Sequence, residues 1–117
     1  MRDALALAAT ADLAVHASRS ESGPLVLAEY AALAVPVIST RVGGMASALA
    51  NLDATWFVPP DDSERLRTAL RALLALPANE RRLVGARQRA SARALFDIAG
   101  VMPSWYAVYA EAMRVHR

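Results

Sequence analysis

The 117-residue sequence contains no cysteine, which excludes disulfides, thiolate catalysis and cysteine-ligated metal sites. Lysine is also absent, since all 13 basic residues are arginine, and this excludes Schiff-base and P-loop chemistry. The two histidines, His16 and His116, stand alone, so no zinc cluster is expected. No apolar run reaches the ~20 residues of a membrane span, and the N-terminus lacks a signal-peptide pattern. These absences predict a cytoplasmic protein with no transmembrane segment and no metal site.

The composition is that of a folded chain. Hydrophobic residues make up 56% and charged residues 21%, which excludes an intrinsically disordered protein. The length predicts a single domain over residues 1–117. The 27 alanines and the exclusive use of arginine indicate a GC-rich bacterial gene rather than a function.

Apolar runs alternate with helical patterns along the chain. Strands are predicted over residues 12–17, 35–39 and 54–58, and helices over 2–10, 24–34, 45–51, 62–76, 78–96 and from 103 onward. This alternation predicts βαβ units and a parallel sheet with helices on both faces. A complete doubly wound domain has about five or six strands. The expected fold is therefore α/β, a partial Rossmann-like three-layer domain with a short parallel sheet, whose other strands lie upstream.

Two helices carry further expectations. Asp61 or Asp62 is expected to cap the helix that ends at Pro77, and with Asp61 as the cap Glu64 would complete a capping box. The apolar stripe of this helix is expected to comprise Leu66, Ala69, Leu70, Leu73 and Leu74. Pro103 is expected to open the last helix, where one face carries Trp105, Val108, Tyr109, Ala112 and Met113. An exposed apolar face of this kind predicts a homodimer or an aggregation-prone monomer.

The residues suited to binding gather in two loops. Ligands of open parallel sheets bind beyond the carboxyl ends of the strands, where loops 18–24 and 40–44 are expected. Each loop leads into a helix N-terminus, which favours an anion such as phosphate. Glu21 and Glu29 flank the first of these turns, and carboxylates accept hydrogen bonds from groups such as sugar hydroxyls.

The stretch ADLAVHASRSESGPLVLAEYAALAVPVISTRVGG resembles the signature segment of retaining GT-B glycosyltransferases of the family-4 type. It combines an E-x₇-E spacing with a preceding Ala-Asp strand and a following P-V-I-S-T strand and Gly-Gly pair. The later segments WFVPPDDSERLRTAL and WYAVYAEAM also resemble parts of these enzymes, so the similarity covers nearly the whole chain.

This resemblance implies the C-terminal domain of a GT-B enzyme, which binds a UDP- or GDP-linked sugar and transfers a hexosyl group with retention, without a metal or cofactor. Glu21 would be the catalytic residue that contacts the donor sugar, and Glu29 would bind the ribose. The donor sugar and diphosphate would be held by Ser22, Gly23, Pro24, Leu25, Gly43 and Gly44. An Arg/Lys pair and an N-terminal acceptor domain would lie upstream, so the 117-residue chain alone is expected to be inactive.

Four features depart from the family pattern. Pro24 stands where many members have glycine, Ala34 replaces a helix-ending glycine, and Trp56 replaces a turn glycine. Ser47 and Ala48 stand where an acid is usual. A left-handed backbone at Ala34 would cost ~1 kcal/mol or more.

Alternative interpretations remain open. The chain could be a degenerate or truncated module that serves binding or assembly without catalysis. Glu21 could instead cap a helix, Glu29 could be a solvated or arginine-paired residue, and His16 is expected to be a packed or edge histidine rather than a base. The arginine-rich helix has no interleaved aromatic residues, so no nucleic-acid partner is expected.

Overall fold

The computed structural model describes residues 2–23 and 25–115. In these residues the elements follow in the order α1 (Arg2–Ala8), β1 (Ala14–His16), α2 (Leu25–Ala32), β2 (Val37–Thr40), α3 (Gly43–Leu52), η1 (Ala54–Trp56), β3 (Phe57–Val58), α4 (Ser63–Ala75), α5 (Ala78–Phe96) and α6 (Ile98–Val115). The strands form one parallel sheet in the order β1-β2-β3. The short parallel sheet predicted from the sequence is therefore confirmed.

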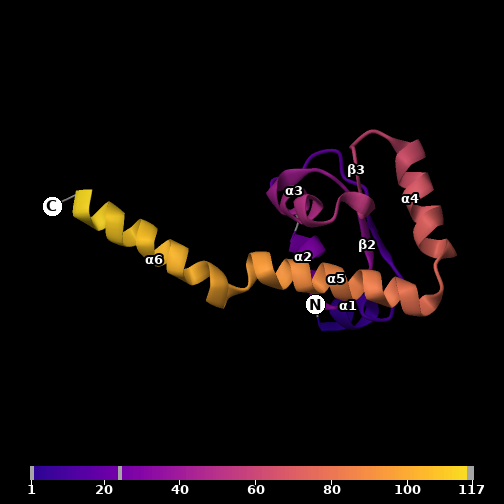
Figure 1. Cartoon of the computed structure of the whole chain (residues 1–117), viewed down its shortest axis with the longest axis horizontal. Coiled ribbons are helices and arrows are strands. Elements are labelled where there is room, and N and C mark those ends of the chain that lie inside the picture. The colour runs from indigo at the N-terminus through magenta and orange to yellow at the C-terminus, as the bar shows by residue number, and fades with distance from the viewer. Residues whose placement is uncertain (1, 24, 116–117) are drawn as a thin grey trace.

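Helices pack on both faces of the sheet because consecutive residues of β2 point in opposite directions. Val37 lies in one core with residues of α2, α3 and α5, whereas Ile38 lies in a second core with residues of α4 and α5. Figure 1 shows β2 and β3 between α3 and α4. Both side chains are fully buried, and burial of each contributes about 1.5–3 kcal/mol. The prediction of helices on both faces is confirmed.

The expected strand over 54–58 is wrong in its first half. Asp53 accepts a hydrogen bond from the Thr55 N–H at 3.0 Å and caps a 3₁₀ helix, so β3 begins only at Phe57. The apolar stripe of α4 is also narrower than predicted, because Leu74 is 52% exposed.

The N-cap of α4 is Asp62, so the capping box expected from Asp61 is wrong. The Asp62 carboxylate accepts a hydrogen bond from the Arg65 N–H at 2.9 Å. Asp61 instead has a φ of 58°, in the left-handed region that aspartate tolerates better than most residues.

Helix α6 begins five residues before Pro103, contrary to the prediction. The Asp97 side chain accepts a hydrogen bond from the Ala99 N–H, and the Asp97 carbonyl accepts from Gly100 and Val101. These bonds form the first turn, and Pro103 lies inside the helix. Figure 1 shows that α6 extends away from the rest of the chain. The radius of gyration is accordingly 16.5 Å, against about 13 Å for a compact chain of this length.

Among the residues described, no helix has both the length and the apolar character needed to cross a membrane.

Helix α2 ends in a Schellman motif at Ala34. The Val35 N–H bonds to the Tyr30 carbonyl at 3.0 Å, and the Ala34 N–H bonds to the Ala31 carbonyl at 2.9 Å. Ala34 has a φ of 56°, so this alanine occupies a conformation that favours glycine. The left-handed backbone expected at this position is therefore present.

Replacement of Ala34 by glycine is expected to raise the free energy of unfolding by about 0.5–1 kcal/mol. The substitution relieves about 1–2 kcal/mol of backbone strain at the left-handed position, which stabilises the folded state. Against this, glycine raises the conformational entropy of the unfolded chain, which lowers the free energy of unfolding by up to about 1 kcal/mol. Urea denaturation followed by circular dichroism measures the change. The control Ala32→Gly, inside α2, should lower stability by about 1 kcal/mol, since it introduces the same residue at a helical position. Equal effects of the two substitutions would contradict the expectation.

Candidate functional site

The loops that follow β1 and β2 meet at the carboxyl edge of the sheet. The Thr40 hydroxyl, at the end of β2, donates a hydrogen bond to the Ser18 carbonyl at 2.6 Å. The Gly44 N–H, at the start of α3, reaches the Ser22 carbonyl at 3.5 Å. The loop after β1 is therefore tied both to the neighbouring strand and to the helix that follows that strand.

Helix α3 presents backbone N–H groups to this edge. It begins at Gly43, two residues before the predicted start, so Gly43 and Gly44 belong to its first turn and not to the preceding loop. Val42 is the N-cap and provides no side-chain hydrogen bond to the first-turn N–H groups. Gly43 has a φ of 76°, which glycine adopts without strain. Free N–H groups at the positive end of a helix dipole suit an anion.

The backbone around the glycines is open to a ligand. A Cβ built at Gly23 or at Gly44 would have no atom within 4 Å. Ser22, Gly23 and Gly44 are all exposed, and so is Leu25 in the first turn of α2. Pro24, the remaining member of the predicted donor-binding set, lies outside the described residues.

Glu21 lies in the loop after β1 with its carboxylate partly ordered by neighbours. The Ser18 hydroxyl lies 3.0 Å from Glu21 Oε1 and 3.2 Å from the Ser20 carbonyl, and it can donate its one proton to either oxygen. His16 Nε2 lies 3.5 Å from the same oxygen, and the side chain of Glu21 is 36% exposed. Both contacts fall on Oε1, and among the described residues no hydrogen bond or ion pair is formed by Oε2.

Glu29 lies on α2, eight residues further along the chain. Its side chain is exposed, on the face opposite the buried Leu27 and Ala31. Within residues 2–23 and 25–115, the recorded ion pairs and side-chain hydrogen bonds do not include the Glu29 carboxylate. The structure therefore does not support an arginine-paired role, and it does not bring Glu29 into contact with Glu21.

Sequence reasoning missed the polar cluster beneath Glu21. His16 ends β1 and stands opposite Ser39 of β2 in the strand register. Its Nδ1 lies 3.2 Å from the Ser39 hydroxyl, and its side chain is 14% exposed. As expected for a packed or edge residue, His16 lies half-buried at the end of the outer strand β1, and in addition both ring nitrogens have polar neighbours. The contact could have been inferred from the sequence, because His16 and Ser39 are polar residues at the ends of adjacent parallel strands, and such ends meet at one edge of the sheet.

A hollow of about 250 Å³ at the same edge of the sheet is lined by Ala17, Ser18, Arg19, Thr40, Asp61, Asp62, Ser63 and Leu66. Glu21 and the glycines of the candidate site are not among the residues that line it. This volume is below the ~300–1,000 Å³ typical of small-molecule pockets. Arg19 pairs with Asp61 across it at 2.7 Å. In the described part of the chain, no three His, Asp or Glu side chains gather as a metal ion would require.

Comparisons with known proteins agree with one another. Residues 1–90 match the family described as Glycosyl transferases group 1. Two curated relatives, both described as glycogen synthase, come from the CDC 1551 / Oshkosh and ATCC 25618 / H37Rv strains of Mycobacterium tuberculosis. Each is 36% identical over 114 residues, which cover 97% of this chain and 27% of the relative. The chain thus spans about a quarter of the length of these relatives. No solved structure matches it significantly.

Proposed function

The chain belongs to the group 1 glycosyl transferases, and on that premise we propose that it is the donor-binding part of a retaining GT-B glycosyltransferase. Its α/β fold is a partial Rossmann-like domain of this family. The observation that carries the proposal is the contact between the Ser22 carbonyl and the Gly44 N–H. It places the loop with Glu21 against the uncapped start of α3, so that a sugar and its diphosphate can be bound side by side.

In this proposal the diphosphate is held by the first-turn N–H groups of α3 other than that of Gly44, which donates to the Ser22 carbonyl, and by the backbone N–H groups of Ser22 and Gly23. Glu21 Oε2 accepts a hydrogen bond from a donor-sugar hydroxyl, and Glu29 accepts one from the ribose. The bond between the sugar C1 and the phosphate oxygen breaks, and the acceptor oxygen bonds to C1 on the same face. The departing phosphate receives the acceptor proton, so the reaction needs no metal or cofactor.

The rest of the enzyme is part of the proposal. Residues 1–117 form one domain, and an N-terminal domain binds the acceptor and completes the donor site. The relatives described as glycogen synthase favour glycogen as the product. A UDP- or GDP-linked donor, a cytoplasmic location and the lack of a nucleic-acid partner stay predictions.

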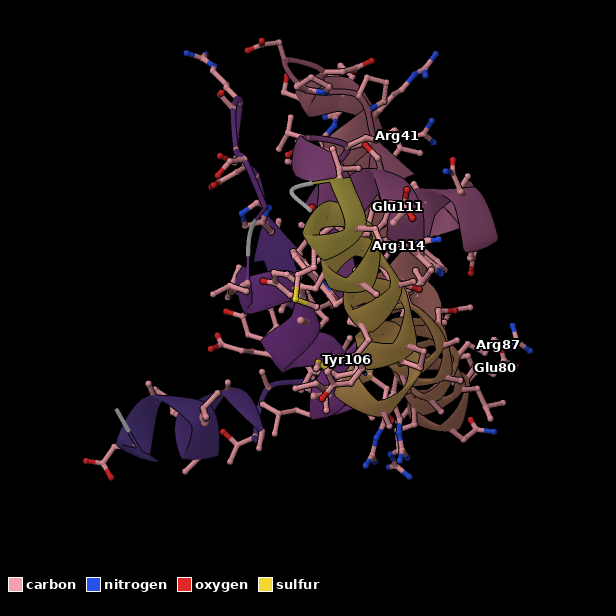
Figure 2. All side chains as sticks on the ribbon, turned by 90° about the vertical axis from the view of Figure 1, so that its left-hand side faces the viewer. Arg41, Glu80, Arg87, Tyr106, Glu111 and Arg114 are labelled. Carbon is pink, nitrogen blue, oxygen red and sulfur yellow. The ribbon has the colours of Figure 1, made fainter. Side chains whose placement is uncertain are left out.

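Titration of the ¹⁵N-labelled chain with UDP-glucose and GDP-glucose tests donor binding. We expect weak binding that shifts the amide signals of Ser22, Gly23, Gly43 and Gly44, with no sugar transfer by the chain alone. Glu29→Ala should weaken binding at least tenfold, because a hydrogen bond to a charged group is worth about 1.5–3 kcal/mol. The control Glu80→Ala removes an exposed acid from α5, labelled in Figure 2, and should change nothing. Unchanged affinity in Glu29→Ala would remove the ribose role, and turnover by the chain alone would contradict the two-domain proposal.

The exposed face of α6 supports a second candidate function in assembly. Trp105, Val108, Tyr109 and Met113 are each more than half exposed, as predicted for a face without a partner. The Trp105 and Tyr109 rings lie 6.1 Å apart between centroids. Figure 2 looks along α6 and labels Tyr106, Glu111 and Arg114 on it.

We therefore expect the chain to form dimers or larger assemblies at high concentration, because association buries this apolar face. Light scattering measures the mass. Trp105→Glu should return the chain to a monomer, since it puts a charge at the centre of the face. The matched control Ala110→Glu lies off the face, one turn before Arg114, and should leave association unchanged. A monomer at all concentrations would rule out this assembly role.

A further inference from the structure

We propose that His16 is a positioning residue, which holds the Glu21 carboxylate in the orientation needed to contact the donor sugar. This inference rests on the proposed function, because it gives Glu21 its sugar-binding role. His16 belongs to the rigid part of the site: it ends β1, its side chain is 14% exposed, and its partner Ser39 is completely buried. Glu21, in contrast, lies in an exposed loop and needs an external support.

The hydrogen bonds around Ser39 determine how the imidazole is oriented. The Ser39 hydroxyl donates its single proton to the Thr40 carbonyl at 2.8 Å. The same oxygen lies 3.2 Å from His16 Nδ1, within hydrogen-bond distance. The ring is thereby held with Nε2 3.5 Å from Glu21 Oε1. A series of contacts from Thr40 through Ser39 and His16 to Glu21 thus connects the buried strand β2 to the exposed loop.

The ring contacts polar groups on two sides. Nε2 faces the Glu21 carboxylate from the loop, and Nδ1 faces the uncharged Ser39 hydroxyl from β2; Ser18, the other partner of Glu21, is also uncharged. The imidazole therefore lies between the buried strand and the carboxylate that it is proposed to position.

The experiment compares a nucleotide sugar with its nucleotide, because Glu21 is assigned to the sugar alone. NMR titration measures the affinity of the chain for UDP-glucose and UDP, or for GDP-glucose and GDP. The pair used is the one that binds the wild-type chain. His16→Leu and Ser39→Ala should each lower the affinity for the sugar nucleotide about five- to tenfold. The affinity for the nucleotide alone should stay within twofold of the wild-type value. His16→Gln keeps an N–H donor at the end of its side chain and should restore most of the loss.

The outcomes separate this inference from the proposal beneath it. A wild-type chain that binds neither ligand overturns the proposed function, and the role of His16 with it. A wild-type chain that binds both, while His16→Leu and Ser39→Ala weaken both equally or neither, overturns the positioning role and leaves the proposed function standing. Ser39→Ala removes a single oxygen, so it tests the connection even if His16→Leu fails to fold. Amide spectra of each variant establish that the sheet is intact.

Discussion

Replacement of Gly85 by alanine is expected to lower the free energy of unfolding by about 3 kcal/mol or more, at or above the upper end of the usual cost of overpacking. Gly85 is a buried residue of α5 that faces the end of α2. A Cβ at this position would lie 2.0 Å from the Ala34 carbonyl oxygen, 2.8 Å from the Ala34 carbonyl carbon and 3.2 Å from Pro36 Cδ. The first two atoms belong to the backbone, so a side-chain rotation cannot relieve the overlap and α5 must move.

Gly100→Ala is the matched control for this substitution. Gly100 also lies in a helix, α6, but a Cβ there would have no atom within 4 Å. Alanine is favoured over glycine in helices by about 0.8–1 kcal/mol, so this change should be neutral or stabilising. Urea denaturation followed by circular dichroism should thus give opposite signs for the two substitutions. If Gly85→Ala unfolds at the wild-type urea concentration, the close approach of α5 to Ala34 is wrong.

The sequence predicts the layered arrangement because it depends on local periodicity. The apolar runs that contain β1 and β2 and the helical stripes between them are visible without tertiary information. The ends of elements were predicted less well, since Asp53, Asp62 and Asp97 each cap a helical turn by a side-chain hydrogen bond. An aspartate next to a predicted helix can cap it or stand one residue outside it, and Asp61 and Asp62 show that composition does not separate the two.

The candidate site was also predicted only in part from the sequence. The loop with Glu21 and the neighbouring start of α3 at Gly43 were found because the carboxyl ends of parallel strands meet at one edge. The contact of His16 with Ser39 was missed because it depends on the register of β1 against β2, which the strand patterns leave undetermined. The approach of Gly85 to Ala34 depends on the packing of two helices 51 residues apart in sequence, and an isolated glycine in a helical pattern does not indicate its neighbour.

Gln88 supports β2 from outside the sheet. β3 first pairs at Ser39, so it does not extend beside Val37 at the start of β2. The Gln88 side chain fills this place: its Oε1 accepts a hydrogen bond from the Val37 N–H, and its Nε2 donates one to the Val37 carbonyl, both at 2.8 Å. Gln88 is 5% exposed and Val37 is fully buried. The side-chain amide therefore replaces the backbone of a missing strand and joins α5 to the sheet.

Gln88→Leu is expected to lower the free energy of unfolding by about 2–6 kcal/mol, because it leaves a buried N–H and a buried C=O without partners, each at about 1–3 kcal/mol. Thermal denaturation measures the change. The control Arg89→Leu introduces the same residue at the next, exposed position of α5 and should stay within about 0.5 kcal/mol of wild type. A loss in Gln88→Leu no larger than that in Arg89→Leu would show that these two hydrogen bonds do not hold α5 to β2.

Gln88→Glu separates the two hydrogen bonds from the volume of the side chain. The introduced carboxylate keeps the acceptor for the Val37 N–H but sets a second oxygen against the Val37 carbonyl, and burial and repulsion raise the pKa of this carboxyl above its unfolded value. The folded state then binds the proton more tightly than the unfolded state, so stability falls as the pH rises from the unfolded pKa through the folded one. Relative to wild type at each pH, the variant should be strongly destabilised at pH 7 and recover towards pH 4, where the protonated carboxyl can donate to the Val37 carbonyl. If the loss of stability relative to wild type is the same at both pH values, the introduced carboxyl is exposed to solvent and does not contact Val37.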